Sequence, residues 1–183
     1  MQIAIGPMTE EAARAVLAWR YEGLYAFYNT DPQDLHDGLQ EMLAGSYYAA
    51  TDGHGALVGF FCFGAPAQVP GGHLYDLYAD EALDIGLGMR PDLTGRGLGR
   101  GFLTAGLDFA RQRFAPATFR LAVAAFNQQA IRLDEKLGFQ AVATFVSPTR
   151  NGEATFWLMT LPASRAGNRR SGRSHPGRSC HLR

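Results

Sequence analysis

Several features are scarce in this chain of 183 residues, and each absence excludes a class of protein. There are two cysteines, Cys62 and Cys180, which are too few for a disulfide framework. No apolar run approaches the roughly 20 residues that span a bilayer, and the absence of any Gly-Lys pair excludes a Walker phosphate loop. His36, His54 and His73 lack metal-ligand spacing, so we expect no metal, and we expect a reducing, cytoplasmic location.

The zero net charge hides an uneven distribution. Six of the 17 basic residues lie from Pro162 onward, where there is no acidic residue, so residues 1–161 hold 11 cationic side chains against 17 acidic ones. We expect residues 1–161 to form one folded domain whose acidic surface suits an amine-bearing substrate, and residues 162–183 to be a disordered basic tail. The composition of Ala163–Arg183 would allow contact with nucleic acid or an anionic surface, but we favour a solvated tail or a reading-frame extension.

The hydrophobic spacing predicts an α/β chain with mixed strand pairing. A helix should begin after Thr9, an N-cap residue, and three more helices are expected at 32–43, 98–114 and 127–137. Residues 73–78 fit a strand or a loop, and this choice stays open. Hairpins at both ends and a helical crossover in the middle predict both antiparallel and parallel pairs. The expected strands are 2–5, 47–51, 56–64, 82–89, 119–125, 140–147 and 155–160.

The stretch Arg96–Gly101 carries three alternate glycines between an expected strand and an expected helix. The first amides of a helix have no intrahelical partner and lie at the positive end of its dipole, where a phosphate group is stabilised. Alternate glycines remove the Cβ atoms that would hold a bulky anion away, and Arg96 and Arg100 add positive charge. The stretch therefore predicts an anion site, although an ordinary glycine-rich turn is also compatible with it.

Two motifs in this order resemble the GCN5-related N-acetyltransferase (GNAT) superfamily. Residues 89–101, Met-Arg-Pro-Asp-Leu-Thr-Gly-Arg-Gly-Leu-Gly-Arg-Gly, are similar to its acetyl-coenzyme A motif. Residues 127–139 are similar to its second motif, Asn-x-x-Ala-x-x-Leu-Tyr-x-Lys-x-Gly-Phe. The resemblance implies an α/β (α+β) fold with a mixed, mostly antiparallel sheet of six to seven strands, a splayed parallel pair and about four flanking helices. It also implies transfer of an acetyl group from acetyl-CoA to a primary amine, by direct attack in a ternary complex.

The resemblance implies a cofactor role for each matching position. The backbone of Leu87, Gly88 and Met89 would hold the pantetheine arm and the acetyl carbonyl, and the Asn127 side chain would contact the pantetheine side. From their local sequence alone, Asn127 is a helix N-cap and the other three residues fit a buried strand. The pyrophosphate would be held by amides of the glycine-rich loop, those of Arg96, Gly97, Gly99, Arg100 and Gly101.

One position departs from the second motif. Asp134 stands where the family carries the tyrosine that protonates the departing thiolate. Helical spacing puts Asp134 on the apolar arc with Ala130, Leu133 and Leu137, so it should face inward and need a partner or a raised pKa. Three interpretations stay open: a protonated acid in the place of the tyrosine, a contact for the substrate ammonium, or a structural acid bonded to backbone amides.

The attacking amine must lose a proton, so a carboxylate or a water chain is expected near the site. Asp84 is the first candidate, because it shares a strand face with Gly86 and Gly88, whose missing side chains would leave room for a ligand. Glu81 and Asp76 are the reserves. Exposed polar positions at the start of a strand would explain Asp84 and Glu81 equally well.

The amine pocket has no motif of its own. Its lining is expected from residues 19–28, which are dense in aromatics, and from residues 65–80, although clustered aromatics are more often core. The remaining candidates for the acid are four tyrosines, Tyr25, Tyr28, Tyr75 and Tyr78.

We expect a small-molecule or peptide amine as the acceptor, leave a homodimer open, and expect no membrane partner and no nucleic acid except through the basic tail. A rival interpretation is a catalytically silent acyl-CoA-binding regulatory module. The loss of the usual tyrosine at position 134 favours this rival.

Overall fold

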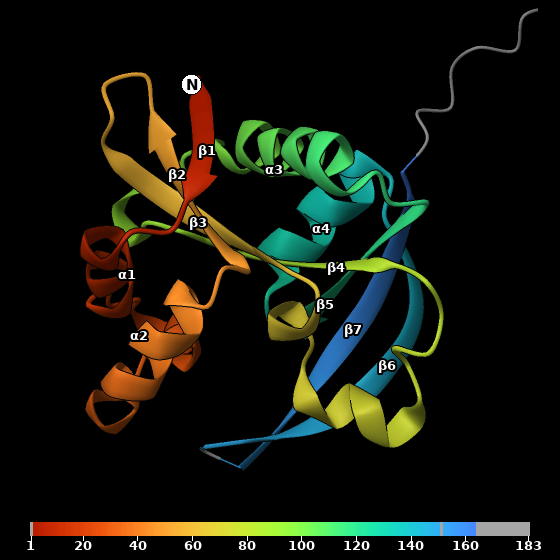
Figure 1. The fold of residues 1–183 in the computed structure, drawn as a ribbon. Helices are drawn as coiled ribbons and strands as arrows, with labels where there is room; N and C mark the ends of the chain where they lie inside the picture. The colour runs from red at the N-terminus through yellow and green to blue at the C-terminus, as the bar shows by residue number, and fades with distance from the viewer. Residues whose placement is uncertain (1, 151, 164–183) are drawn as a thin grey trace, which may run out of the picture.

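A computed structural model describes residues 2–150 and 152–163 of the chain, which fold around one seven-stranded sheet (Figure 1). The spatial order is β1-β2-β3-β4-β5-β7-β6, and every neighbouring pair is antiparallel except β4 and β5, which are parallel. This confirms the expected mixed sheet with one parallel pair. The strands are β1 (Ile3–Pro7), β2 (Tyr47–Asp52), β3 (Leu57–Phe63), β4 (Leu83–Met89), β5 (Thr118–Ala124), β6 (Gln140–Thr149) and β7 (Gly152–Pro162).

The helices of the described chain also lie close to the expected positions. The Thr9 hydroxyl accepts a hydrogen bond from the Ala12 amide and caps α1, as its sequence predicts. Residues 73–78 form the end of a short 3-10 helix and the turn after it, which answers the open choice between strand and loop. The α-helices are α1 (Glu10–Leu17), α2 (Leu35–Leu43), α3 (Gly99–Phe114) and α4 (Gln128–Leu137). The 3-10 turns are η1 (Gly23–Tyr28), η2 (Pro32–Asp34), η3 (Ala65–Ala67), η4 (Pro70–Tyr75) and η5 (Pro91–Leu93).

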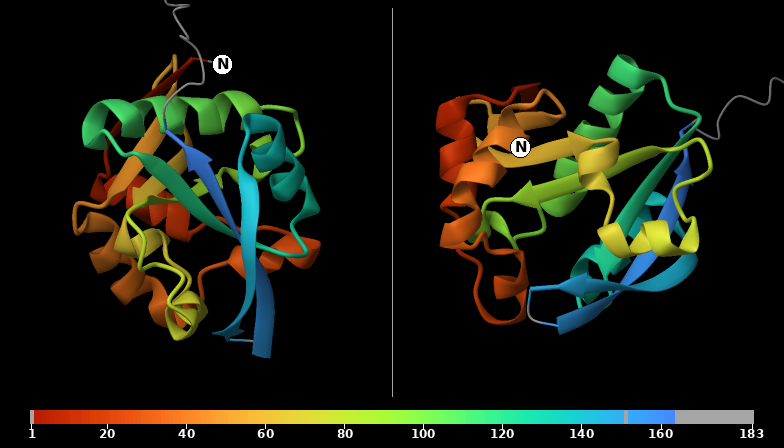
Figure 2. Two further views of the ribbon diagram at one scale, coloured as in Figure 1. Left: turned by 90° about the vertical axis from the view of Figure 1, so that its right-hand side faces the viewer. Right: turned by 60° about the horizontal axis from the view of Figure 1, so that its bottom comes forward.

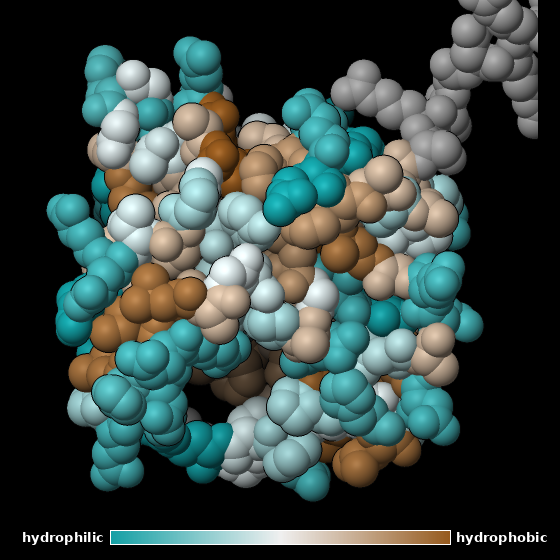
Figure 3. All heavy atoms as spheres, viewed as in Figure 1, coloured by the Kyte–Doolittle hydropathy of each residue, from teal (hydrophilic) through white to brown (hydrophobic). Residues whose placement is uncertain are grey.

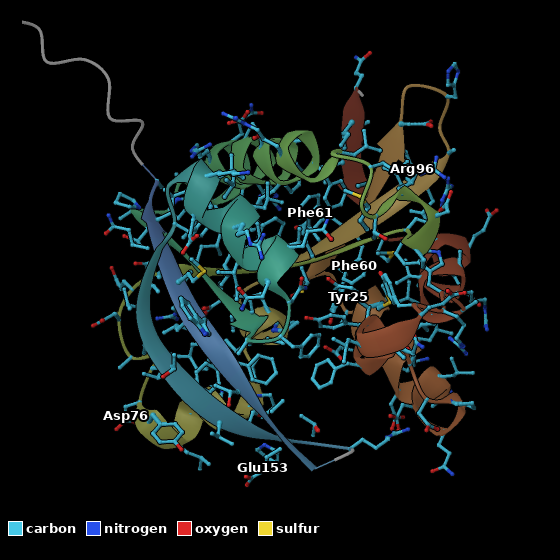
Figure 4. The ribbon with its side chains drawn as sticks, turned by 180° about the vertical axis from the view of Figure 1, so that it is seen from behind. Tyr25, Phe60, Phe61, Asp76, Arg96 and Glu153 are labelled. Atoms are coloured by element: carbon cyan, nitrogen blue, oxygen red, sulfur yellow. The ribbon has the colours of Figure 1, made fainter. Side chains whose placement is uncertain are left out.

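Alternate side chains of β3 separate the two faces of the sheet. Phe61 and Phe63 are buried in the main core with residues of α3 and α4, whereas Phe60 packs with the smaller cluster of α1 and α2. Figure 4 labels Phe60 and Phe61 on opposite sides of their strand. Gly106 lets α3 approach closely, since a Cβ atom there would lie 2.3 Å from Cε1 of Phe61. The start of α3 is thereby held over one face of the sheet.

The parallel pair opens into a fork. β4 and β5 are paired only through Leu83 with Phe119 and Asp84 with Arg120. Beyond these pairs the strands separate, as Figure 1 shows. We call the opening between residues 85–89 of β4 and 121–124 of β5 the fork. The splayed pair implied by the family resemblance is therefore present.

The β6–β7 hairpin reaches under the opposite side of the molecule. Its tip lies beside the segment that precedes α2, as the right-hand view of Figure 2 shows. Arg150 at the tip forms ion pairs with Asp31 and Asp34 in and before η2. These ion pairs connect the tip of the β6–β7 hairpin to η2 and the residue before it.

Two residues past the expected boundary at residue 161 are part of the described structure. Pro162 belongs to β7, and the amide of Ala163 donates a 2.9 Å hydrogen bond to the carbonyl oxygen of Ala117. The Arg111 guanidinium in turn donates to the carbonyl oxygen of Ala163. The rest of the basic tail, residues 164–183, lies outside the described residues. Among the helices that are described, none has the length and apolar character needed to cross a membrane.

Candidate active site

The start of α3 is open to solvent. Phe102 makes the first intrahelical hydrogen bond, from its amide to the carbonyl oxygen of Leu98, so the amides of Gly99, Arg100 and Gly101 have no intrahelical partner. Gly97 has φ +76°, in the left-handed region that favours glycine, and a Cβ atom at Gly97 or Gly101 would meet nothing within 4 Å. The mouth of the helix is therefore free of protein atoms at these positions, as an anion site requires.

Two arginines flank this mouth. Arg96 and Arg100 are both exposed, and neither forms a salt bridge with a carboxylate in the described part of the chain. By contrast, Arg90 is paired with Asp92 at 2.7 Å. Two guanidinium groups are thus available beside the unpaired amides, and together they favour a group with more than one negative charge.

The edge of β4 that faces the fork also carries unpaired backbone groups. Gly64 donates to the carbonyl oxygen of Asp84, and Arg90 donates to that of Val58, so the even-numbered residues of β4 bond to β3. Leu87 and Met89 therefore direct their amides and carbonyls into the fork, where no described strand pairs with them. Except for the Met89 carbonyl oxygen, which accepts a hydrogen bond from the Tyr21 hydroxyl, these are the groups that an extended arm could use.

Gly88 does not share this position. Its backbone groups point toward β3, and a Cβ atom on it would lie 2.3 Å from Cε1 of Phe60. A glycine is needed there to accommodate Phe60. Of the expected set Leu87, Gly88 and Met89, the geometry leaves the backbone groups of Leu87 and the amide of Met89 directed into the fork.

Asn127 lies at the far arm of the fork, where it caps α4. Its Oδ1 accepts a 3.2 Å hydrogen bond from the amide of Ala130, which confirms the N-cap interpretation. Its Nδ2 donates to the hydroxyl oxygen of Tyr28, also at 3.2 Å. A contact between Asn127 and a cofactor stays a prediction.

Two tyrosines bridge the arms of the fork. The Tyr21 hydroxyl donates a 2.8 Å hydrogen bond to the carbonyl oxygen of Met89, and the Tyr21 and Tyr28 rings meet edge to face with their centroids 6.4 Å apart. Burial raises the pKa of Tyr21 to about 12, and burial also raises the pKa of Tyr28 although its bond to Asn127 opposes this. The bridge thus runs from β4 to α4. Tyr21 belongs to the aromatic segment but was not among the residues predicted for the site.

The other tyrosines named from the sequence lie in different surroundings. The Tyr78 hydroxyl is engaged by Val69, whose amide donates to it and whose carbonyl oxygen accepts from it. Tyr75 is exposed on η4, and Tyr25 packs edge to face against Phe126. Of the four named tyrosines, Tyr28 is the one that contacts the predicted cofactor residue Asn127.

Asp134 faces inward, as its helical position predicts. It is 4 % exposed, and within the described chain no backbone amide or side chain donates to its carboxylate. Burial, with a smaller contribution from Glu135, raises the pKa of Asp134 to about 7. The missing donors argue against a structural acid bonded to backbone amides, and they leave the two functional interpretations.

Asp84 is buried and paired, so it is not an exposed polar position. Its two carboxylate oxygens accept hydrogen bonds from Nε and Nη2 of Arg120, at 2.6 and 2.9 Å, and Oδ2 also accepts from Nε2 of Gln68 at 2.7 Å. The residue is 3 % exposed. Its role as proton acceptor stays a prediction, and both of its carboxylate oxygens already accept hydrogen bonds.

The room expected beside Asp84 is filled by protein. A Cβ atom at Gly86 would lie 2.6 Å from Sγ of Cys62, and the space at Gly88 is filled by Phe60. The expectation that these glycines leave a ligand space was therefore wrong. They are small because neighbouring side chains of β3 lie across them.

The reserve acids lie away from the open end of the fork. Glu81 is exposed in the bend before β4, two residues before the first pair with β5. Asp76 follows η4, and Figure 4 shows it at the opposite end of the molecule from Arg96. No group of three metal-ligating side chains occurs among the described residues.

The surface is hollowed on the side seen in Figure 3. The hollow lies in the lower part of that view, where Figure 1 places α2 on one side and the β6–β7 hairpin on the other. The ion pairs of Arg150 with Asp31 and Asp34 join these two elements. This hollow approaches the fork from the side opposite the α3 layer.

Known proteins were compared with the chain in sequence and in fold. Mycothiol acetyltransferase from Acidothermus cellulolyticus is 36 % identical over 137 residues, which is 67 % of this chain, and the match spans 40 % of the length of that curated relative. A chimera of spermidine N-acetyltransferase SpeG from Vibrio cholerae and hSSAT has a TM-score of 0.69 at 17 % identity, covering 89 % of this chain and 96 % of the other. An N-acetyltransferase from Staphylococcus aureus Mu50 has a TM-score of 0.63 at 17 % identity, covering 90 % and 100 %.

The structural neighbours share the fold at low sequence identity, and the family is shown by a separate match. Residues 13–139 match the sequence model of the acetyltransferase (GNAT) family, and this range includes the open mouth of α3, the edge of β4 and the whole of α4. The family expected from the two sequence motifs is thereby confirmed. The chain belongs to the GNAT family of acetyltransferases.

Proposed function

We propose that this protein is an acetyl-CoA-dependent N-acetyltransferase that acetylates a primary amine by direct attack in a ternary complex. The observation that carries the proposal is the open mouth of α3 beside the unpaired edge of β4. Unpaired amides at a helix start suit a diphosphate, and an unpaired strand edge suits the amides of a pantetheine arm. Both features lie in one range that matches an acetyltransferase family.

The residues present fit acetyl-CoA as a cosubstrate. The amides of Gly97, Gly99, Gly101 and the two arginines, with the guanidinium groups of Arg96 and Arg100, would hold the pyrophosphate. Leu87 and Met89 would bind the pantetheine arm and polarise the acetyl carbonyl. Asn127 would contact the arm from the opposite side of the fork.

We propose that Asp134 supplies the proton that the departing thiolate takes up. It holds the position of the family tyrosine, faces inward and has no donor on its carboxylate in the described structure. Burial keeps this carboxyl partly protonated near neutral pH, as a general acid requires. An aspartate side chain is shorter than a tyrosine, so a water molecule would complete the path to the sulfur.

The proton of the attacking amine needs a separate acceptor. Asp84 lies at the closed end of the fork and Glu81 is the reserve, so both remain candidates. Because Arg120 binds both oxygens of Asp84, we propose that a water chain carries the proton and that the paired carboxylate orients it.

The acceptor is proposed as a small-molecule or peptide amine. The names of the relatives point to two chemical classes, a polyamine for the spermidine enzymes and the amine acetylated by mycothiol acetyltransferase. The acidic composition of residues 1–161 suits either, since both acceptors are cationic before they react.

The test is a titration followed by an assay. Acetyl-CoA is titrated into the full chain by calorimetry, and thiol release is then measured with a panel that includes spermidine, amino-sugar conjugates, amino acids and peptide amino termini. Binding with thiol release on at least one amine supports the proposal. Failure to bind acetyl-CoA at millimolar concentration contradicts it. Binding without turnover on any amine would instead favour the acyl-CoA-binding regulatory module, to which the absent tyrosine at position 134 also points.

A further inference from the structure

The closed end of the fork contains a buried network whose contacts extend beyond the proposed proton path. Asp84 of β4 and Arg120 of β5 are each 3 % exposed and form a two-bond ion pair. The pair lies at the last point where the two strands are still hydrogen-bonded to each other. The pair therefore marks the closed end of the fork, from which β4 and β5 separate.

The same two side chains bind the segment of residues 65–80 at both ends. Gln68 donates to Asp84 at 2.7 Å, and Nη1 of Arg120 donates to the carbonyl oxygens of Leu77 and Asp80 at 3.1 and 3.3 Å. The guanidinium of Arg120 also lies over the ring of Tyr78, 4.9 Å from its centroid. The ion pair thus holds a long segment that forms no strand and only short 3-10 turns.

This segment and the neighbours of the tyrosine bridge pack against the same hydrophobic cluster. Val69, Leu77 and Tyr78 pack in one cluster with Phe27 and Phe126, the residues that precede Tyr28 and Asn127 in the chain. The ring centroids of Phe27 and Phe126 are 5.2 Å apart. A displacement of the segment would therefore be passed to the Tyr28–Asn127 contact at the open end of the fork.

The segment lies on the sheet face opposite α3. A Cβ atom at Gly86 would meet both Cys62 and Ala67, and the side chain of Cys62 points to the face of Phe60, away from the α3 side where Phe61 lies. The anion mouth and the segment are thus on different sides of the fork. If the phosphates enter from the α3 side, the amine is expected from the side of residues 65–80.

We propose that Asp84 and Arg120 are positioning residues, which hold the segment 65–80 as the wall of the amine site. Two buried charges are costly to desolvate, and replacing such a pair by apolar side chains often leaves a protein as stable as before. We therefore attribute the pair to the orientation of the segment 65–80 and not to the stability of the fold. This inference rests on the proposed function, because it needs an amine site on that side of the fork.

The test compares two double variants. Asp84→Leu/Arg120→Met removes the pair and keeps apolar volume. Asp108→Leu/Arg111→Met is the control, because Arg111 also combines an ion pair, a carbonyl contact with Ala163 and a ring contact with Phe119, but in the C-terminal half of α3 instead of in the fork. Three quantities are measured: the Kd for acetyl-CoA, KM and kcat for the amine, and hydrogen exchange of peptides from residues 65–80.

The proposal predicts a selective effect. In Asp84→Leu/Arg120→Met the segment exchanges faster by tenfold or more and KM for the amine rises by tenfold or more, while the Kd for acetyl-CoA stays within about twofold. The control changes none of the three. Unchanged exchange would show that the pair does not hold the segment, and faster exchange with an unchanged amine KM would show that the segment is no part of the amine site. Either result overturns the proposal.

Two further arms separate the alternatives. Asp84→Asn keeps the shape of the side chain, so loss of the acidic limb of the pH profile of kcat in this variant would make Asp84 the proton acceptor and overturn the positioning role. If the double variant does not fold, Arg120→Lys replaces it, since one ammonium cannot reach Asp84 and both carbonyls. If the wild-type protein has no activity on any amine, the proposed function fails, and the exchange measurement still decides whether the pair holds the segment.

Discussion

The hydroxyl of Tyr21 and the carbonyl oxygen of Met89 are joined by a 2.8 Å hydrogen bond across 68 positions of the chain. Met89 ends β4 with its backbone directed into the fork, so the bond ties the aromatic segment to the edge that is proposed to bind the pantetheine arm. Tyr21 is fixed in turn by Asn29, which accepts from its amide and donates to its carbonyl oxygen. The aromatic segment is thereby linked to β4 through one phenol.

Tyr21→Phe removes this link while keeping the ring. We expect the free energy of unfolding to fall by about 0.5–1.5 kcal/mol, the net value of one hydrogen bond, and the KM for the amine to rise because the aromatic segment loses its anchor on β4. Urea unfolding and amine kinetics measure the two effects. Tyr25→Phe is the control, since the Tyr25 hydroxyl has no hydrogen bond in the described structure. Equal effects of the two changes would contradict the role of the bond.

Gly101→Leu fills the mouth of α3. Its Cβ atom meets no protein atom within 4 Å, and leucine is a better helix former than glycine, so the fold should be as stable as before or more stable. We expect the Kd for acetyl-CoA to rise by at least tenfold, because the side chain takes the space proposed for the pyrophosphate. Calorimetry measures the binding, with Gly53→Leu in the β2–β3 turn as a control that also points into open space. A Kd for Gly101→Leu equal to that of the wild-type protein would contradict a phosphate site at the mouth of α3.

Asp134→Asn and Asp134→Tyr test the proposed acid. A general acid must be protonated, so kcat of the wild-type protein should fall as the pH rises through about 7, the raised pKa of Asp134. We expect Asp134→Asn to lower kcat by about 10²-fold or more and to remove this limb. Asp134→Tyr, which installs the family residue, should restore turnover and move the limb to higher pH. A wild-type pH profile in Asp134→Asn would exclude the role.

The same residue should make stability depend on pH. Burial raises the pKa of Asp134 from 3.8 to about 7, so between these values the folded protein keeps a proton that the unfolded chain has released. The contribution of this group to stability therefore falls as the pH rises from about 4 to about 7, by up to about 4 kcal/mol at 1.36 kcal/mol per unit. Asp134→Asn does not titrate, so its stability relative to wild type should improve over this range. Denaturant unfolding at pH 5 and pH 8 measures the difference, and an unchanged or opposite trend would contradict it.

Local signals in the sequence were sufficient for most of the fold. Thr9 and Asn127 were identified as caps because a cap is decided by the residues that follow it within one turn. The inward position of Asp134 followed from helical spacing alone. The fork could be expected only from the family resemblance, since no local pattern says where two parallel strands separate.

The contacts that the sequence did not reveal join distant positions. Asp84 meets Arg120 across 36 positions and Tyr21 meets Met89 across 68, and neither pair shares an element. A glycine such as Gly86 is ambiguous for a related reason. A missing side chain leaves space for a ligand or for a neighbouring residue, and Cys62 comes from a strand whose register the sequence does not state.

The ion pairs of Arg150 with Asp31 and Asp34 connect the tip of the β6–β7 hairpin to the segment before α2, on either side of the hollow. All three side chains are partly exposed, so dissolved salt weakens these ion pairs. The salt concentration should then affect how fast the acceptor amine associates with the protein. At high salt, association of a bulky amine is expected to become faster relative to a small one. The change Arg150→Gln should produce the same shift at low salt, which competition kinetics with two amines of different size would measure.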